Sequence, residues 1–385
     1  MVASVKMKYH LYKNLFFKVY AIVEDGRVRI KTSGIASSLM KPMVSGMLDI
    51  FDGEKPAKVE DGRLIFSTWM PPIPSTAFSR SVANQIKALR GSMVPEQVTI
   101  SITEECPNNC IHCALPDTKN KDRLSPEMVK NVIDQSLDMG TTLIIFDGGE
   151  PLVYEGLEDL IRHVDTNRAV SAMFTSGVGL TPERARSLKE AGLYMVSVSF
   201  DSANEEGHDY MRGRVGVYKD AICAVKNLMN AGLLVNIYVV ISPRNIDELD
   251  DFYKLACEME VHELSFYEIV PTGRWIDHEN DILSPDDHRK LDDFVARTDT
   301  MDGPRVFSIP HVMKTTGCFA GRKWLHVTPQ GDVLPCACIP IPFGNIHKDT
   351  LKSVWKKIRK DPAYNADSCL MRDTEFRTLH IGVKK

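Results

Sequence analysis

The chain has 385 residues, of which 43% are hydrophobic and 25% charged, so it can bury a large core and its length predicts two or three domains. A formal net charge of -4 and a pI near 6.3 exclude a global attraction to nucleic acid. The start of the chain lacks a secretory signal, and no apolar run of about 18 residues occurs. We therefore expect a cytoplasmic protein with no integral membrane segment, whose nine cysteines are metal ligands or buried thiols rather than disulfides.

Residues 1-95 are predicted to form a separate N-terminal α+β module. VYAIVEDGRVRIKT from Val19 and AKVEDGRLIFST from Ala57 both contain Asp-Gly, which is typical of a tight β-hairpin turn. The methionine-rich segment at 37-51 is better explained by core packing than by a lipid or peptide surface. The proline-rich MPPIPS at 70-75 is typical of a connector. Substrate binding is the hypothesis for this module.

Residues 96-300 are predicted to form an α/β domain, because short apolar runs alternate there with amphipathic stretches. Helices are expected after Ser125, Thr181 and Asn245, which are good helix N-caps. Strands that are apolar on both faces need helices outside, and right-handed crossovers curl such a sheet into a partial (β/α)6 TIM-like barrel whose active mouth lies at the strands' C-terminal edge. The expected strands are QVTISIT from Gln97, TLIIF from Thr142, VSAMF from Val170, YMVSVSF from Tyr194, VNIYVVI from Val235 and HELSFYEI from His262.

Three cysteines follow the first expected strand in a C-x3-C-x2-C array, Cys106, Cys110 and Cys113. A structural zinc site needs four ligands, and His112 is the nearby candidate for the fourth. A 4Fe-4S cluster held by three thiolates instead leaves one iron free to bind another molecule. The array by itself leaves a zinc knuckle and an iron-sulfur cluster both open.

Further short motifs lie at the ends of the later strands, in a fixed order. They are GGEP (Gly148, Gly149, Glu150, Pro151), TSG with Ser176, SFD with Ser199 and Asp201, MRG with Arg212 and Gly213, and VPTGR from Val270. Together with the cysteine array, these motifs resemble those of the radical S-adenosylmethionine (SAM) superfamily. Two positions depart from the family's usual pattern: His112 stands where an aromatic residue is common, and Ser176 stands where asparagine is usual.

The resemblance implies a cluster on the three cysteines whose open iron binds SAM. The reduced cluster then breaks a carbon-sulfur bond of SAM, and the resulting 5'-deoxyadenosyl radical abstracts hydrogen from a substrate carbon. It also implies an anaerobic cytoplasm and a low-potential electron donor such as ferredoxin or flavodoxin. The SAM-binding residues that it implies are Gly148, Gly149, Glu150, Pro151, Ser176, Ser199, Arg212 and Val270. No catalytic acid or base is assigned, although Glu268 and Arg274 are candidates.

Residues 301-385 carry four more cysteines. The stretch from Cys318 to Cys336 reads C-x12-G-x4-C and predicts a hairpin that turns at Gln330-Gly331. This pattern resembles the SPASM and twitch extensions of radical SAM enzymes, which hold auxiliary iron-sulfur clusters, with Cys338 and Cys369 completing four thiolates. The SPASM block for a second auxiliary cluster is missing, so one auxiliary cluster, expected to be 4Fe-4S, is the upper limit. A structural zinc on the same cysteines is the alternative.

Two other features have simpler interpretations. Cys223 and Cys257 lie on the apolar faces of expected helices and are predicted to be core residues. The basic run from Lys356 to Lys360 is predicted to be a solvated helix face rather than a docking site for an acidic partner.

The favoured function is a radical SAM maturase that modifies a peptide or protein. The alternative is radical modification of a small molecule, namely a cofactor, tetrapyrrole or lipid precursor. A third hypothesis is a non-enzymatic iron-sulfur or zinc scaffold, which would need neither GGEP nor Ser199 and Arg212. Cobalamin chemistry is disfavoured because residues 1-95 are too short for a cobalamin domain.

Overall fold

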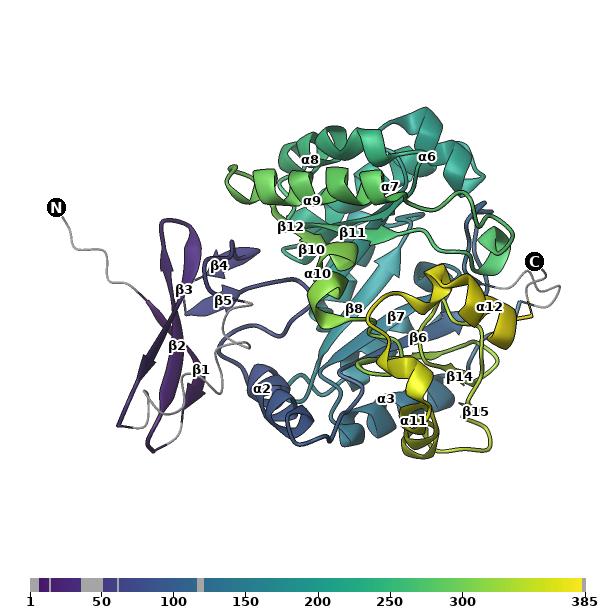
Figure 1. Cartoon of the computed structure of the whole chain (residues 1–385). Helices are drawn as coiled ribbons and strands as arrows, with labels where there is room; N and C mark the ends of the chain where they lie inside the picture. The colour runs from purple at the N-terminus through teal and green to yellow at the C-terminus, as the bar shows by residue number, and fades with distance from the viewer. Residues whose placement is uncertain (1–6, 14, 36–50, 61, 116–120, 383–385) are drawn as a thin grey trace.

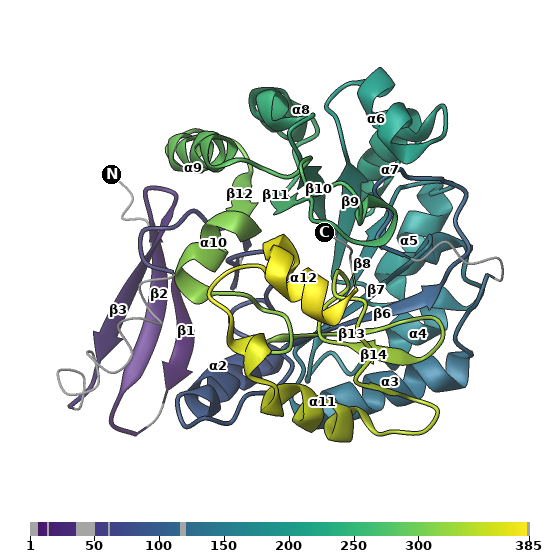
Figure 2. The same ribbon diagram turned by 45° about the vertical axis from the view of Figure 1, so that its right-hand side comes forward.

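The computed structural model describes residues 7-13, 15-35, 51-60, 62-115 and 121-382. A curved sheet at its centre carries helices on its outer side, and a smaller antiparallel sheet stands apart at the N-terminal end (Figures 1 and 2). None of the helices within the described ranges is long and apolar enough to cross a membrane.

The six predicted strands are confirmed, and they form a continuous parallel array in chain order. They are β6 (Gln97–Thr103), β7 (Leu143–Gly148), β8 (Val170–Thr175), β9 (Met195–Phe200), β10 (Leu234–Ile241) and β11 (Glu263–Glu268). The array has the partial-barrel topology expected from the alternation of strands and helices.

The sheet continues on both sides of this array, which the sequence did not predict. β12 (Arg305–Ser308) pairs in parallel with β11, and β13 (Trp324–Val327) pairs in parallel with β6. β13 then forms an antiparallel hairpin with β14 (Asp332–Leu334), which pairs with β15 (Gly344–Asn345). Both edges of the barrel are therefore covered by the C-terminal 85 residues, so the boundary expected at residue 300 lies inside one sheet.

Two of the three expected N-caps begin helices that connect these strands. Ser125 and Thr181 accept hydrogen bonds from the backbone N–H groups of Met128 and Arg184. The third helix starts later than predicted, because a short 3-10 turn at Ile246–Glu248 precedes it. The bounds are α3 (Pro126–Met139), α4 (Leu157–His163), α5 (Pro182–Glu190), α6 (Glu205–Arg212), α7 (Val217–Asn230), α8 (Leu249–Glu258), α9 (Pro285–Asp299) and α10 (Ile309–Thr316).

The two faces of the barrel strands differ in chemistry. On β6 the outward residues Val98, Ile100 and Ile102 are fully buried in the core beneath the helices. The inward residues of the same strand are polar, among them Thr99 and Ser101. An apolar inner cluster does form lower in the barrel, from Leu143, Ile145, Val170, Ala172, Met195 and Leu234. The expectation that both faces are apolar thus holds only for the lower layer.

The N-terminal module contains the two predicted hairpins. β2 (Lys18–Glu24) and β3 (Arg27–Ser33) pair through a turn at Asp25 and Gly26, whose φ angles of 51° and 73° are both left-handed. β1 (Lys8–Lys13) extends this sheet, and β4 (Lys58–Glu60) pairs with β5 (Arg63–Ile65). The methionine-rich segment, apart from Phe51, lies outside the described residues.

The module also closes the lower end of the barrel. Glu263, at the start of β11, is fully buried and accepts hydrogen bonds from Ser67 and Thr68, at 3.0–3.2 Å. The indole N–H of Trp69 donates to Ser265, and its ring packs near Tyr267. The adjacent MPPIPS segment is more than a connector, since Ile73 pairs with Leu64 through two backbone hydrogen bonds and Ser75 caps α2 (Thr76–Ala88).

The C-terminal module packs α11 (Leu351–Lys360) beside α3, and α12 (Thr374–His380) ends the described chain. Lys356, Lys357 and Lys360 are exposed, as expected for a solvated helix face. The prediction for Cys223 was wrong, because this thiol is exposed. The buried face of α7 is formed by Val217, Ala221, Ala224, Val225 and Leu228, and Cys223 points about 200° away from Ala221 around the helix. Cys257 is half-buried.

Candidate active site at the mouth of the barrel

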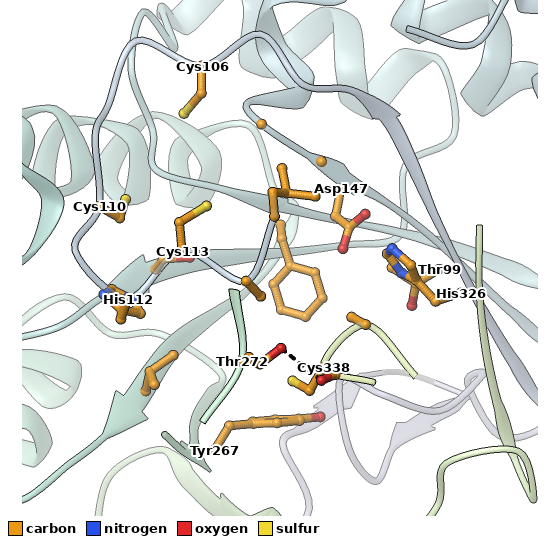
Figure 3. A pocket seen from close by; sticks show the side chains of 18 of the residues that line it. Thr99, Cys106, Cys110, His112, Cys113, Asp147, Tyr267, Thr272, His326 and Cys338 are labelled. Atoms are coloured by element: carbon orange, nitrogen blue, oxygen red, sulfur yellow. Dashed lines mark hydrogen bonds between the residues drawn. The ribbon is translucent and has the colours of Figure 1, made fainter. Parts of the chain in front are cut away.

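The three N-terminal cysteines lie on the loop that follows β6. All three are free thiols, and Figure 3 shows the sulfur atoms of Cys106, Cys110 and Cys113 pointing toward one space. Cys106 is exposed, whereas Cys110 and Cys113 are half-buried. One short loop therefore presents three metal-ligating atoms to the same side of the barrel mouth.

Glycines in three other loops let the chain pass close to this cysteine loop. A Cβ atom on Gly149 would lie 2.2 Å from the carbonyl oxygen of Glu105. The same atom on Gly213 would lie 2.3 Å from that of Asn109, and on Gly273 2.2 Å from that of Cys113. The resemblance implies that Gly148 and Gly149 contact SAM. The structure gives Gly149 a further role, because the absence of a side chain lets the protein's own backbone approach closely.

Backbone hydrogen bonds fix the cysteine loop at the same places. The N–H groups of Asn109 and Ile111 donate to the carbonyls of Arg212 and Met211, each at 3.0 Å. The N–H of Arg274 donates to the carbonyl of Cys113, and its guanidinium donates to the carbonyl of Cys110, also at 3.0 Å. Arg274, a candidate acid or base, thus holds the loop in place.

Glu268, the other candidate acid or base, is also engaged by the protein. One carboxylate oxygen lies 2.6 Å from Arg372 and 3.1 Å from His288, and the side chain is almost fully buried. Two basic partners satisfy it, so Glu268 links β11 to α9 and to the C-terminal module.

A buried ionic network lies beneath Cys110. Arg212 Nε is 2.6 Å from Asp201 Oδ2, and His112 Nε2 is 3.4 Å from Asp201 Oδ1. Burial opposes ionisation of Asp201, but the interactions with Arg212, His112 and His208 together outweigh it, and the pKa of Asp201 is lowered. Burial raises the pKa of Cys110, and Arg212, 3.9 Å from its sulfur, acts in the opposite direction. Arg212 therefore supplies positive charge where a thiolate would need it.

Glu150 of the GGEP motif is fully occupied by neighbouring residues. One oxygen accepts from the Thr175 hydroxyl at 2.7 Å and the Leu152 N–H at 3.2 Å; the other accepts from the N–H and hydroxyl of Ser176 at 2.8 and 2.6 Å. Burial raises the pKa of Glu150, and these hydrogen bonds oppose the rise. The carboxylate joins the ends of β7 and β8. Its predicted contact with the amino group of SAM stays a prediction.

A cavity of about 480 Å³ occupies the mouth and the upper interior of the barrel. Most of the predicted residues line it, namely Gly148, Gly149, Ser176, Ser199, Arg212, Val270, Cys106, Cys110, Cys113, Cys336 and Cys338. Glu150, Pro151, Cys318 and Cys369 do not. Most of the residues expected to bind SAM, the three cysteines of the first loop and two of the four C-terminal cysteines thus share one chamber.

The deeper wall of the cavity is formed by residues that the sequence analysis missed. Phe174, Tyr238, Tyr267 and Trp324 contribute aromatic rings, and Asp147 and His326 contribute titratable groups. Figure 3 shows Asp147 and His326 on the side of the cavity away from Cys110. The alternation of polar and apolar residues in QVTISIT was the available signal, because it places one face of β6 in a polar interior.

The four C-terminal cysteines come from separate segments. Cys318 follows α10, Cys336 and Cys338 follow the β13–β14 hairpin, and Cys369 lies near the chain end. Burial and then neighbouring Cys318 raise the pKa of Cys369, while a hydrogen bond with Cys338 and then burial raise that of Cys336. The carbonyl of Cys338 accepts from Thr272 at 2.8 Å, which ties this group to the barrel (Figure 3).

The three cysteines of the first loop fit an iron-sulfur cluster better than a single metal ion. The three sulfur atoms of the first loop converge from one side only, which leaves the cavity side open to another molecule. Among the described His, Cys, Asp and Glu side chains, no group of three or more is arranged to hold one metal ion. A 4Fe-4S cluster instead offers a different iron to each thiolate.

Comparison with known proteins identifies the family. The sequence profile of the radical SAM superfamily matches residues 100–256, and that of an iron-sulfur cluster-binding domain, SPASM, matches residues 318–377. The mycofactocin maturase MftC of Mycolicibacterium smegmatis is 32% identical over 282 residues, which are 69% of this chain and 71% of MftC. This chain belongs to the radical SAM superfamily. A SPASM domain follows its radical SAM domain.

Two other similarities bear on substrate and fold. The AdoMet-dependent heme synthase of Methanosarcina barkeri is 27% identical over 289 residues, which are 68% of this chain and 82% of the synthase. The structure of Streptococcus suis SuiB bound to the precursor peptide SuiA has a TM-score of 0.60 at 14% identity, and the match covers 93% of this chain and 90% of SuiB. SuiB therefore shares the fold of this radical SAM enzyme. Family membership implies SAM, a 4Fe-4S cluster that binds it, and an auxiliary iron-sulfur cluster.

Proposed function

We propose that this radical SAM enzyme is a maturase that modifies a side chain of a peptide or protein. The observation that carries the proposal is the shared cavity, which the Cys106–Cys113 loop lines at one end and Cys336 and Cys338 line at the other. A reacting side chain held there lies between the two cofactor sites. The similarity to MftC, named as a maturase, and to SuiB, solved with a precursor peptide, supports a peptide substrate.

In this proposal Cys106, Cys110 and Cys113 hold the SAM-binding cluster, and Gly148, Gly149, Ser176, Ser199, Arg212 and Val270 surround SAM in the cavity. When bound, the reduced cluster and SAM supply a 5'-deoxyadenosyl radical that removes a hydrogen atom from the substrate. The chain's own work is to position the reacting groups and exclude water. Glu150 fixes the turn that bears Ser176 from outside the cavity, and Glu150 and Pro151 complete the proposed set of SAM-binding residues.

Cys318, Cys336, Cys338 and Cys369 are proposed to hold the auxiliary cluster. Support for this proposal comes from the effects of neighbouring thiols on pKa: Cys336 raises the pKa of Cys318, and Cys318 and Cys336 raise that of Cys369. Cys338 contacts Cys336. A structural zinc on the same thiols is the alternative.

The remaining assignments are also proposals. Residues 96-300 form the radical SAM barrel, residues 301-385 the auxiliary-cluster domain, and residues 1-95 a module that recognises the substrate beyond the cavity. A low-potential donor, ferredoxin or flavodoxin, reduces the first cluster in an anaerobic cytoplasm. We expect this setting because a cluster behind the exposed thiol of Cys106 is accessible to oxygen.

The experiment is an anaerobic assay of the reconstituted protein with dithionite and SAM. We expect release of 5'-deoxyadenosine, and a mass change in a short peptide encoded beside the gene when that peptide is added. No release of 5'-deoxyadenosine by protein with a full iron content would contradict the enzyme and favour an iron-sulfur scaffold.

A small-molecule substrate is the second candidate. The similarity to heme synthases and the aromatic wall of the cavity favour a planar compound such as a tetrapyrrole precursor. The same assay separates the candidates: release stimulated by an iron-free or iron-bearing porphyrin precursor, and by no peptide, selects this alternative.

A further inference from the structure

Three neighbouring strands bring Ser101, Asp147 and His326 together in the cavity wall. Ser101 of β6 stands opposite Asp147 of β7, and His326 of β13 stands opposite Thr99, two residues before Ser101 on the same face. The Ser101 hydroxyl lies 2.7 Å from Asp147 Oδ1 and 3.3 Å from His326 Nε2. Asp147 and His326 both line the cavity, and Asp147 directly precedes Gly148.

The hydrogen-bond donors and acceptors of this group fix the state of the imidazole. A hydroxyl has one proton, and Ser101 gives it to Asp147 Oδ1 when that carboxyl is ionised, a state that burial opposes by raising the pKa of Asp147. Ser101 therefore accepts from His326, so Nε2 bears the ring proton and Nδ1 has a free lone pair. Burial lowers the pKa of His326, in agreement with a neutral ring.

Within the described part of the chain, His326 Nδ1 has no hydrogen-bond partner, although only 3% of the residue is exposed. Buried acceptors without a partner are rare because each costs free energy. The side chain that bears this nitrogen lines the cavity. The rings of Tyr238, Tyr267 and Trp324 line the same cavity, and they favour a flat aromatic group.

We propose that His326 is the proton acceptor for the substrate, and that the substrate's reacting group is an aromatic ring bearing an O–H or N–H, such as a phenol or an indole. This inference rests on the proposed function. The substrate's O–H or N–H bond breaks, its electron pair stays on the substrate, and a new N–H bond forms at Nδ1. The resulting imidazolium is balanced by the Asp147 carboxylate through Ser101. The transfer needs no oxidant or reductant.

The first test determines the tautomer of His326 in the full-length protein with oxidised clusters. Nitrogen NMR on protein labelled at histidine, with His326→Leu to assign the signal, should show a neutral ring protonated at Nε2 at pH 7. A ring protonated at Nδ1 would overturn the proposal, because Asp147 would then donate to Ser101 and Ser101 to the ring.

The second test uses p-cresol and toluene as probes, since they differ only in the hydroxyl. Calorimetry should show p-cresol binding about fivefold more tightly than toluene, the ratio expected for one neutral hydrogen bond. His326→Leu should remove this preference. If the leucine variant does not fold, Ser101→Ala takes its place. This variant keeps the imidazole ring but no longer fixes its tautomer, so it should reduce the preference for p-cresol. Equal binding of the two probes by the wild type would overturn the proposal.

A matched control separates this result from a general effect of losing a histidine. His311 on α10 pairs with Asp292 at 2.9 Å but is exposed, so His311→Leu should keep the fivefold preference. Release of 5'-deoxyadenosine by the wild type is scored separately. If the wild type releases no 5'-deoxyadenosine but still prefers p-cresol, the proposed function is wrong and His326 remains an acceptor site. If the wild type releases 5'-deoxyadenosine but binds p-cresol and toluene equally, only the role of His326 as acceptor is wrong.

Discussion

The two cysteine groups reach their sites in different ways. Cys106, Cys110 and Cys113 lie within eight positions of one loop, which neighbouring loops fix through glycine contacts and backbone hydrogen bonds. The other four cysteines are spread from residue 318 to residue 369, so the site proposed for them depends on the packing of a hairpin, a helix and the last described segments. A local group can be recognised from spacing, whereas a dispersed one depends on the whole module.

The most exposed and the most buried of these cysteines belong to different groups. Cys106 is exposed and the first loop opens to the cavity, whereas Cys318 is 6% exposed and does not line the cavity. The other five are half-buried, and Cys336 and Cys338 line the cavity together with the first loop. Each prediction below changes one group and asks whether the other is affected.

The largest effect is expected for Cys110→Ala. Loss of a cluster ligand should lower release of 5'-deoxyadenosine by more than about a hundredfold, since even changes next to a metal ligand cost 10–100-fold. The control is Cys223→Ala, which removes an exposed thiol of α7 and should release the product at the wild-type rate. Full activity of Cys110→Ala would disprove the assignment of the first cluster.

Cys369→Ala should affect only the second group. Reconstituted wild type should contain about eight iron and eight sulfide ions per chain, from two four-iron clusters, and the variant about four of each. Iron and sulfide analysis measures this, with Cys257→Ala as the control that retains eight. If the wild type instead contains four iron ions and one zinc ion per chain, and Cys369→Ala loses the zinc, the second site is a structural zinc site.

A smaller effect is expected from the glycines that support the first loop. Gly213→Ala and Gly216→Ala both place a side chain at a left-handed φ, 63° and 87°, which costs about 1–2 kcal/mol. Only Gly213 faces the loop, where the new Cβ would meet Asn109. The free energy of unfolding should fall further for Gly213→Ala, by about 1 kcal/mol or more, with lower iron at the first site. Equal losses in the two variants would show that the contact is unimportant.

Much of the barrel was accessible from the sequence, because its strands and helix caps are local patterns. The six strands, the caps at Ser125 and Thr181, and the Asp-Gly hairpins follow from residue types at fixed spacings. The hairpin that contains β13 was predicted, but its pairing with β6 was not, and β12 was missed because RVFS is too short to be distinguished from a loop by periodicity. Cys223 was misplaced because an apolar helix segment does not reveal which residues face the sheet.

The sequence by itself determined the chemistry at the barrel mouth, since three thiols in one short loop and the GGEP turn need only local backbone geometry to face the same space. Only the tertiary structure decided what surrounds a substrate. Ser101, Asp147 and His326 lie up to 225 residues apart, and the pairing of β13 with β6 alone brings the imidazole to the other two. Such proximity depends on which strands become neighbours, a choice made by packing over the whole sheet and not by any one segment.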